Sequence, residues 1–269
     1  MLGGGAAAGL FGSLLGLGGG VLIVPLLTLG FGLPLREAVG VSLVAVIMTS
    51  GASSGVYLER RVANLRLGMV LEAFTAAGAL IGALIAFLID ERVLAGLFAV
   101  LLVYVAVTMV RGRGRASPAA GERNAPGVDR RAGSAFVDRL SGSDYRVRGL
   151  VPGAAGSVGA GVSSALLGIG GGLVKVPVMH LVMGVPLRVA TATSNLMIGV
   201  TASAGAVIYL LRGEIDPYVA GPTAIGVFLG ATLGSRTAHR VDLRVLRMLF
   251  VVVLLYTALQ MTRRALGVA

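Results

Sequence analysis

The sequence predicts an all-α polytopic membrane protein built from two homologous repeats, which we expect to be inverted. Composition, long apolar runs and an internal duplication support this prediction. Of the 269 residues, 56% are hydrophobic and only 13% are charged, and the mean hydropathy is +0.90. Soluble domains carry about 25% charged residues, and several runs here approach the roughly 20 apolar residues that cross a bilayer core. A soluble enzyme and a disordered protein are therefore excluded, and the continuous runs disfavour a β-barrel.

The duplication is clearest in a Gly-rich motif. LLGLGGGVLIVP at Leu14–Pro25 recurs as LLGIGGGLVKVP at Leu166–Pro177, an offset of 152 residues. The register continues without a gap through less common residues: Pro34 matches Pro186, Ser42 matches Ser194, Tyr57 matches Tyr209 and Asp90 matches Asp242. Chance similarity of apolar sequence would not preserve such a register. We therefore predict transmembrane repeats at 1–111 and 149–269, joined by a linker at 112–148.

Each repeat is expected to contain the same four segments. The first is a long apolar segment that is broken in its middle by GLGGG or GIGGG. Three full helices follow, at 37–57, 68–89 and 93–110 in the first repeat and at 189–209, 219–240 and 245–261 in the second. The net charge is +11, and nine arginines lie between Arg111 and Arg148. Because basic loops stay in the cytoplasm, the linker is expected there, and nucleic-acid binding is not expected.

The charges of the loops favour inverted over parallel repeats. The loop after the second segment is net positive in repeat one (Glu59 to Arg66) and net negative in repeat two (Arg212 to Asp216). The next loop is net negative in repeat one (Asp90 to Arg92) and net positive in repeat two (Arg236 to Arg247). Corresponding loops are therefore expected on opposite sides of the membrane.

Inversion requires three full crossings per repeat, with the broken segment returning to its own side as a re-entrant hairpin. Both chain termini would then lie outside and the linker inside. The alternative counts each broken segment as one crossing, which gives eight helices and parallel repeats.

The two glycine breaks are the predicted substrate site. Three consecutive glycines cost about 1 kcal/mol each in a helix interior, so each break should be buried in protein or line a wet cavity. The half-helix that follows presents free N–H groups with a partial positive charge, which an anion can approach closely at glycine. The predicted substrate-binding residues are Gly18, Gly19, Gly20, Ser42, Gly170, Gly171, Gly172, Lys175, Ser194 and Asn195. Tight helix packing better explains four other glycines, Gly78, Gly82, Gly230 and Gly234.

Lys175 is the sharpest single candidate, because the other 22 of the 23 basic residues are arginine and it lies in an apolar run. A central charge costs about 2.5 to 3.5 kcal/mol on insertion scales. We expect Lys175 to bind the anion or to relay a proton, the alternative being that it snorkels to the interface. Its partner in the first repeat is Ile23, so the two halves of the site cannot be equivalent. His180 is a second possible proton relay, and Glu72 is interpreted as interfacial.

The paired motifs resemble one known family. G-x-GGG-x-x-x-VP occurs twice, followed by Ala38–Ser42 in repeat one and by Ala190–Asn195 in repeat two. This pattern is similar to that of the TauE/SafE sulfite exporter family of bacterial and archaeal membrane permeases. The resemblance covers both repeats but not the linker. It implies transport of small sulfur oxyanions or organosulfonates, such as sulfite or sulfoacetate, across the inner (plasma) membrane.

The expected function is therefore secondary transport or export of a small anion that is bound between the two half-helices near the bilayer midplane. No ATP-binding P-loop is present, so an ion gradient, a partner protein or the substrate's own gradient must supply the energy. The chain has no cysteine and no paired-carboxylate, Ser-His-Asp or metal-ligand pattern, so we expect no enzyme activity, metal or cofactor. The alternatives are an uncoupled anion channel and a non-transport membrane subunit.

Overall fold

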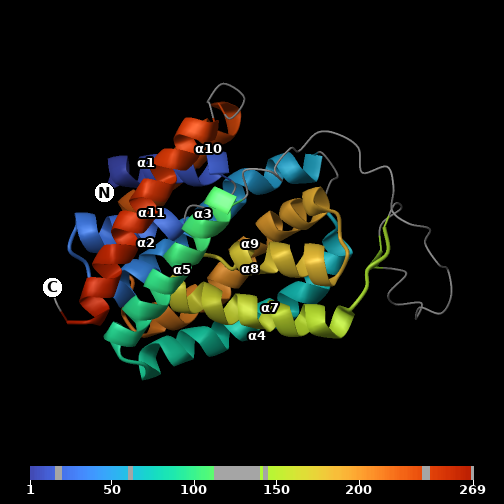
Figure 1. Ribbon diagram of the computed structural model, residues 1–269, viewed down its shortest axis with the longest axis horizontal. Coiled ribbons are helices and arrows are strands. Elements are labelled where there is room, and N and C mark those ends of the chain that lie inside the picture. Colours follow the sequence, from blue (N-terminus) through green and yellow to red (C-terminus); the bar gives the residue numbers. More distant parts are fainter. Residues whose placement is uncertain (16–19, 60–62, 112–139, 142–144, 238–242, 268–269) are drawn as a thin grey trace.

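The computed structural model describes residues 1–15, 20–59, 63–111, 140–141, 145–237 and 243–267, and helices are the only regular elements within them (Figure 1). The first repeat contains α1 (Leu2–Leu15), α2 (Gly20–Pro25), the π-helical turn η1 (Leu26–Gly30), α3 (Leu35–Glu59), α4 (Leu65–Leu88) and α5 (Glu91–Arg111). The second contains α7 (Leu150–Leu167), α8 (Gly172–Pro177), the π-helical turn η3 (Val178–Val182), α9 (Leu187–Leu211), α10 (Pro217–Thr237) and α11 (Leu243–Ala265).

The helices follow the sequence repeat closely. The starts of α2 and α8, at Gly20 and Gly172, are separated by the same 152 residues as the motifs, and so are the starts of α3 and α9. Pro34 and Pro186 stand directly before these last two helices, where the fixed φ of proline suits a helix start. The six predicted full helices are all present, with bounds within a few residues of those expected.

The broken first segment of the second repeat folds back on itself as a hairpin. After the glycine break, α8 and η3 return alongside α7, so that a Cβ added at Gly156 would press against Val178. At the open end of the hairpin, the Arg148 N–H donates to the Met183 carbonyl oxygen over 3.0 Å. The segment therefore begins and ends at the same end of the molecule.

The first repeat has the corresponding arrangement of α1 and α2. Gly4, near the start of α1, faces the side chain of Leu26, which begins η1. Residues 16–19 of the GLGGG motif, with the predicted site glycines Gly18 and Gly19, lie outside the described residues.

Each hairpin packs on a helix of the other repeat, α1 along α10 and α7 along α4. Gly78 and Gly82 make the second contact possible, because a Cβ on either would collide with the carbonyl oxygen of Val158 or Val162 on α7. A matching set on α10 faces α1: Gly226, Gly230 and Gly234. The expected packing role of Gly78, Gly82, Gly230 and Gly234 is thus confirmed, and it follows the general use of small residues between membrane helices.

Helices α3 and α9 cross at the centre and run in opposite directions. The Ser50 hydroxyl donates to the Asn195 carbonyl oxygen (2.8 Å) and accepts from the Gly199 N–H (3.1 Å). Leu43, earlier on α3, instead contacts Gly205, which is later on α9. Since α5 also packs against its counterpart α11, the helix contacts follow an approximate two-fold relation between the repeats.

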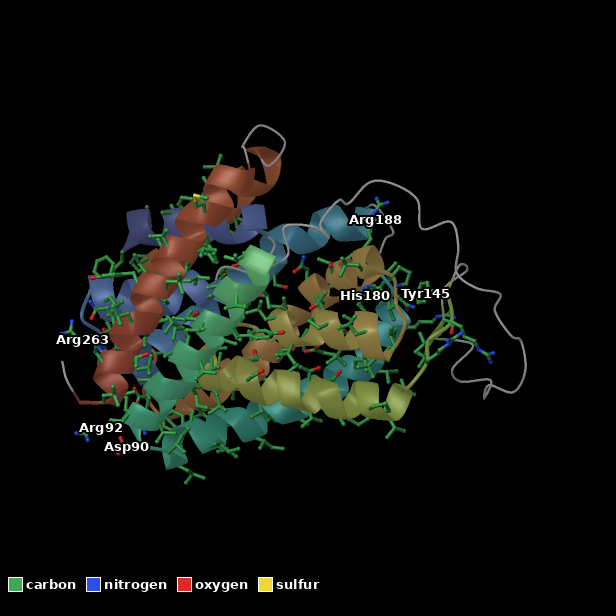
Figure 2. The ribbon with its side chains drawn as sticks, viewed as in Figure 1. Asp90, Arg92, Tyr145, His180, Arg188 and Arg263 are labelled. Carbon is green, nitrogen blue, oxygen red and sulfur yellow. The ribbon has the colours of Figure 1, made fainter. Side chains whose placement is uncertain are left out.

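Charged and polar side chains gather at the two ends of the bundle. Figure 2 shows Asp90, Arg92 and Arg263 at one end and Tyr145, His180 and Arg188 at the other. Arg36 belongs to the first end, because its guanidinium donates to the Ile89 carbonyl oxygen over 2.7 Å. Arg36 and Arg188 are equivalent under the sequence offset, so equivalent positions lie at opposite ends.

The outer faces of the bundle are apolar. Helices α4, α5, α10 and α11 carry many exposed large hydrophobic side chains, among them Met69, Leu88, Val100, Tyr218 and Leu259. Five described helices are long and apolar enough to cross a membrane, over Leu35–Ala52, Leu65–Leu88, Glu91–Thr108, Leu150–Leu167 and Leu187–Leu211. The segments Gly20–Gly30 and Gly172–Val182 are shorter apolar helices. Such a surface belongs against lipid, and the protein is therefore embedded in a membrane.

Most of the predicted linker, residues 112–139 and 142–144, lies outside the described residues. The remainder is anchored near the start of α4. The Asn64 amide donates to the Leu140 carbonyl oxygen and to the Tyr145 hydroxyl, each over 2.8 Å, while its oxygen caps α4 at the Leu67 N–H. Leu140 and Val147 are buried in an apolar cluster with Met179 and Met183 of the second hairpin and its end. This end of the hairpin is therefore covered by protein.

Candidate functional site

The second glycine break meets the start of α2 inside the protein. The Ser42 hydroxyl on α3 donates to the Gly168 carbonyl oxygen over 2.7 Å and lies 3.3 Å from the carbonyl oxygen of Gly20. A Cβ at Gly20 would collide with the same Gly168 carbonyl. One buried serine thus ties the start of the second break, directly after α7, to the start of the half-helix that follows the first break.

The second break requires glycine for its backbone shape. Gly168, Gly170 and Gly171 have φ angles of +66°, +78° and +74°, and a residue with a side chain pays roughly 1 to 2 kcal/mol for that region. Space is also lacking, because a Cβ on Gly170 would lie 2.6 Å from Ile198 and 2.7 Å from Val46. The turn ends at Gly171, and α8 starts at the next residue.

A cavity of about 350 Å³ lies against the start of α8. Its walls come from α5, α8 and α9, with the residues Tyr104, Thr108, Gly172, Leu173, Val176, Pro177, Thr191, Ser194, Asn195 and Ile198. Hydroxyl and amide groups face apolar side chains in this cavity, and no wall residue carries a charge. The Thr108 and Thr191 hydroxyls already donate to carbonyl oxygens of their own helices, so Ser194 is the hydroxyl of this wall that is left without a partner.

Ser194 is the most informative residue of the cavity. It is fully buried, and its hydroxyl has no hydrogen-bond partner in the structure. A Cβ at Gly172 would lie 3.5 Å from this hydroxyl, which puts the hydroxyl beside the first residue of α8. Leaving a buried hydroxyl unpaired costs about 1 to 3 kcal/mol. Ser194 thus offers an unused hydrogen-bond donor at the wall of the cavity.

A second unpaired hydroxyl lies close to the same turn. Ser164, near the end of α7, is fully buried and also has no hydrogen-bond partner. A Cβ added at Gly171 would lie 3.3 Å from the Cβ of Ser164. Most other buried hydroxyls are paired, as those of Thr49 and Thr75 are with carbonyl oxygens one turn earlier on their own helices, although the Thr223 hydroxyl on α10 is also unpaired. Ser164 and Ser194 therefore flank the second glycine turn from two helices.

The predicted site residues fall into three groups. Gly172, Ser194 and Asn195 line the cavity. A second group lies next to these residues but does not line the cavity, and it holds the two breaks together: Gly20, Ser42, Gly170 and Gly171. Lys175 forms the third group, because it lies on α8 but faces another helix.

Lys175 is fully buried and ion-paired. Its ammonium lies 2.8 Å from Glu72 Oε2 on α4, and it donates to the Thr201 hydroxyl on α9 over 3.3 Å. Thr201 in turn donates to Glu72 Oε1 over 2.6 Å. The three side chains form a closed set of hydrogen bonds among three helices, so Lys175 does not snorkel to an interface.

The interpretation of Glu72 as interfacial is wrong. Only 7% of the residue is exposed, because α8 and α9 approach this part of α4 and supply the partners of its carboxylate. Its burial could have been suspected from sequence, since Glu72 is an acid within the otherwise apolar stretch of α4. The cavity residues Tyr104, Thr108 and Thr191 were also not predicted.

His180 is not among the residues that line the cavity and lies in η3, at the end of the second hairpin. Its Nδ1 lies 2.9 Å from the Val185 carbonyl oxygen, which requires the Nδ1–H tautomer for a hydrogen bond. This contact connects η3 to the chain before α9. A proton-relay role for His180 stays a prediction.

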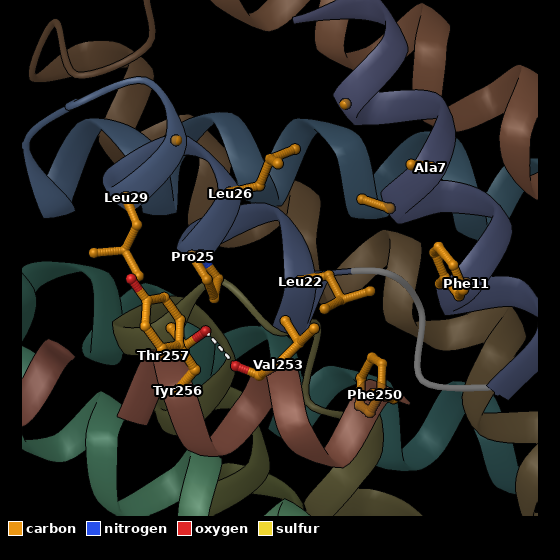
Figure 3. Close-up of a pocket in the computed structure, with 13 residues that line it drawn as sticks. Ala7, Phe11, Leu22, Pro25, Leu26, Leu29, Phe250, Val253, Tyr256 and Thr257 are labelled. Atoms are coloured by element: carbon orange, nitrogen blue, oxygen red, sulfur yellow. Dashed lines mark hydrogen bonds between the residues drawn. The ribbon is translucent and has the colours of Figure 1, made fainter. Parts of the chain in front are cut away.

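The first repeat has a cavity of a different kind. A cavity of about 410 Å³ lies between α1, α2, η1 and α11. Figure 3 shows the side chains that line it, among them Phe11, Leu22, Pro25 and Phe250. The Thr257 hydroxyl donates to the Val253 carbonyl oxygen over 2.7 Å and so is already satisfied. The linings of the two cavities therefore differ in chemical character.

Comparison with known proteins agrees with the membrane fold and the paired motifs. The sequence profile of the family described as "Sulfite exporter TauE/SafE" matches residues 1–261. The chain belongs to the TauE/SafE family. The Bacillus subtilis "probable membrane transporter protein YunE" is 26% identical over 265 residues, which cover 96% of this chain and 94% of YunE. No solved structure is significantly similar to the chain.

Other relatives of this TauE/SafE protein carry the same general description. The "probable membrane transporter protein MJ0441" of Methanocaldococcus jannaschii is 26% identical, over 91% of this chain and 88% of the relative. The "probable membrane transporter protein MamO" of Paramagnetospirillum magneticum is also 26% identical, over 95% of this chain but only 43% of MamO. The TauE/SafE protein described here is accordingly a membrane transporter.

Proposed function

We propose that the protein is a secondary transporter of a small anion, most of all sulfite or an organosulfonate, and that the anion binds in the cavity between α5, α8 and α9. The observation that carries this proposal is the buried, unpaired hydroxyl of Ser194 beside Gly172. An oxyanion accepts several hydrogen bonds at once, and Asn195 and Thr191 lie on the same wall. Sulfur oxyanions enter the proposal through the family, whose description names sulfite export.

The proposal assigns separate roles to the predicted residues. Gly172, Ser194 and Asn195 contact the anion. The start of α8 is kept in place by Gly20, Ser42, Gly170 and Gly171. We propose the same positioning role, at the first break, for Gly18 and Gly19. The Lys175 charge lies on the same short helix as the cavity wall and favours an anion there whenever Glu72 does not neutralise it.

We further propose that the repeats have inverted topology in the cytoplasmic membrane, with the linker on the cytoplasmic side. The antiparallel crossing of α3 and α9 supports this arrangement, and so does the position of Arg36 and Arg188 at opposite ends. Each hairpin would be re-entrant and would bring its glycine break towards the midplane. Transporters built this way rock one repeat against the other around a central site.

Flux in liposomes tests the proposed function. Purified protein reconstituted into liposomes should take up labelled sulfite or sulfoacetate, and this uptake should exceed that of chloride. A coupled transporter should accumulate the anion when a pH gradient is imposed, whereas an uncoupled anion channel should only let it equilibrate. If neither sulfur anion crosses faster than in protein-free liposomes, the proposed function is wrong and a non-transport role is favoured.

A further inference from the structure

The ion pair of Lys175 and Glu72 joins the two repeats. Lys175 lies on α8 in the second repeat, whereas Glu72 lies on α4 in the first, and their charged atoms are 2.8 Å apart. Thr201, on α9, bonds to both and holds the carboxylate on its second oxygen. Any movement of the second hairpin away from α4 must break this contact.

The ion pair has no counterpart at the equivalent positions under the sequence offset. Under the sequence offset the counterparts of Lys175 and Glu72 are Ile23 and Ala224, neither of which carries a charge. The counterpart of Thr201 is Thr49, whose hydroxyl donates to the Ala45 carbonyl oxygen on its own helix. The fold therefore tolerates an apolar contact at this position. Burying two charges costs several kcal/mol per ion, and ionisable residues inside a membrane usually serve transport or proton movement.

Helix α8 connects the pair with the proposed anion cavity. Gly172, Leu173, Val176 and Pro177 line the cavity, whereas Lys175, in the middle of the same helix, faces α4 instead. A change at the ion pair that frees α8 therefore also moves a wall of the cavity. The reverse also holds, since a ligand that draws α8 inward strains the pair.

Few ionisable side chains lie near the Glu72 carboxylate. Helix α8 contributes Lys175 and α9 contributes the neutral Thr201. Helix α7, which packs along α4, has no ionisable residue in its sequence. Among the described residues packed around Glu72, Lys175 is thus the one charged partner, and a proton on the carboxylate would leave the Lys175 charge uncompensated.

We infer that Glu72 is the proton-coupling residue of this transporter and that one proton binds to it for each anion carried. This inference rests on the proposed anion transport. In the step, the Glu72 carboxylate takes up a proton and becomes a neutral carboxylic acid, and the ion pair is lost. The local charge rises from zero to +1, because Lys175 keeps its proton, and one negative charge of the bound anion balances it. Proton and anion therefore cross together in the same direction, and each strengthens the binding of the other.

Calorimetry with sulfoacetate, whose acid groups are both ionised near neutral pH, tests the inference. Binding heats of the purified full-length protein are measured in buffers with different ionisation enthalpies, so that proton uptake appears as the slope. The wild type should take up about one proton per anion by this linkage, and Glu72→Gln should take up none. Glu91→Gln is the matched control, since Glu91 is exposed and an amide can still accept from the Leu35 N–H, as Glu91 does now.

Transport supplies the second measurement. In liposomes, Glu72→Gln should lose accumulation driven by a pH gradient while keeping sulfoacetate exchange at zero gradient. If Glu72→Gln is not folded, the charge-free pair Glu72→Gln with Lys175→Met is used, with the same expected loss of proton uptake. Proton uptake or pH-driven accumulation in a folded variant without the Glu72 carboxylate overturns the inference. If the wild type carries sulfoacetate without taking up protons, the inference is overturned but the proposed anion transport is not. If neither sulfur anion crosses the membrane, the proposed function itself is overturned.

Discussion

At the scale of single residues, the buried hydroxyl groups separate into three classes. Most buried hydroxyls donate to the carbonyl oxygen one turn earlier, as Thr28 and Thr49 do, and such bonds satisfy the group without any ligand. Ser42 bridges the two glycine breaks instead. Ser164 and Ser194 have no partner. Residue type alone cannot distinguish these classes, because the distinction depends on what the neighbouring helix presents.

Replacing Ser194 with alanine should affect binding and stability in opposite senses. Loss of a hydrogen bond to a charged ligand costs about 1.5 to 3 kcal/mol, so sulfoacetate binding should weaken roughly 10- to 150-fold. The ligand-free protein should be as stable as the wild type or more so, because an unsatisfied buried hydroxyl is removed. Calorimetry and thermal unfolding measure the two effects. Ser203→Ala is the control, since the Ser203 hydroxyl donates to the Gly199 carbonyl oxygen, and equal affinity in the two variants would contradict the assignment.

Lys175 and Glu72 should be coupled energetically. Lys175→Met leaves a buried carboxylate without its partner and should destabilise the protein by about 3 to 5 kcal/mol. Adding Glu72→Leu replaces the pair by apolar side chains and should restore stability to near the wild-type value. Thermal unfolding of the ligand-free proteins provides the comparison. A double variant that is less stable than Lys175→Met would argue against a direct pair.

At the scale of secondary-structure elements, the second glycine turn combines backbone conformation with tight packing. Its glycines have positive φ angles, and Gly170 is also enclosed by Ile198 and Val46, which come from the two crossing helices α9 and α3. The turn is thereby held from both repeats, and α8 has a fixed starting point from which to line the cavity.

Gly170→Ala and Gly213→Ala should separate these two contributions. Both glycines have φ near +75° (+78° and +75°), so each alanine pays roughly 1 to 2 kcal/mol of backbone strain. Only the alanine at position 170 also meets neighbouring atoms, because Gly213 has nothing within 4 Å of an added Cβ. Gly170→Ala should therefore unfold at a clearly lower temperature than Gly213→Ala and lose sulfoacetate flux. Equal melting temperatures would mean that packing at Gly170 is unimportant.

The sequence predicted the elements better than their contacts. Apolar runs between prolines, glycines and charged loops sufficed to place the full helices, and the motif pair revealed the repeat. The partner of Lys175 was missed because it lies 103 residues earlier and because the depth of Glu72 depends on its surroundings. Near the start of α4, Leu67 and Leu71 are covered by Val147 and Met183, so this part of the helix is buried by protein from elsewhere in the chain. The side of α8 that faces the cavity likewise became evident only from packing.

At the scale of the whole molecule, the two repeats are related yet unequal. Equivalent helices make equivalent contacts, α1 with α10 and α7 with α4. The ion pair between α8 and α4 nevertheless has no charged counterpart at the equivalent positions Ile23 and Ala224, and the cavity beside α2 is lined mostly by apolar side chains, whereas the one beside α8 includes the unpaired Ser194. A common architecture thus carries a single proposed transport site rather than two.

Accessibility labelling should establish the proposed topology. The chain has no cysteine, so Asp90→Cys and Arg188→Cys each introduce a unique thiol at an exposed position, one at each end of the bundle. Inverted repeats predict that an impermeant reagent labels Asp90→Cys from outside the cell and Arg188→Cys only from the cytoplasm. The parallel alternative, with each broken segment crossing once, places both residues on one side, and labelling from the same face would reject inversion.

The exchange of hairpins between the repeats has a consequence for how the protein is made. Helix α1 is synthesised first, but its partner α10 begins at Pro217, about 200 residues later. At roughly 5 to 20 residues per second, ribosomes need about 10 to 40 s to cover that distance. During this interval the glycine-rich α1 lacks the helix on which it mainly packs, and α4 similarly waits for α7. Either half, if translated alone, would therefore lack the helix on which its hairpin docks.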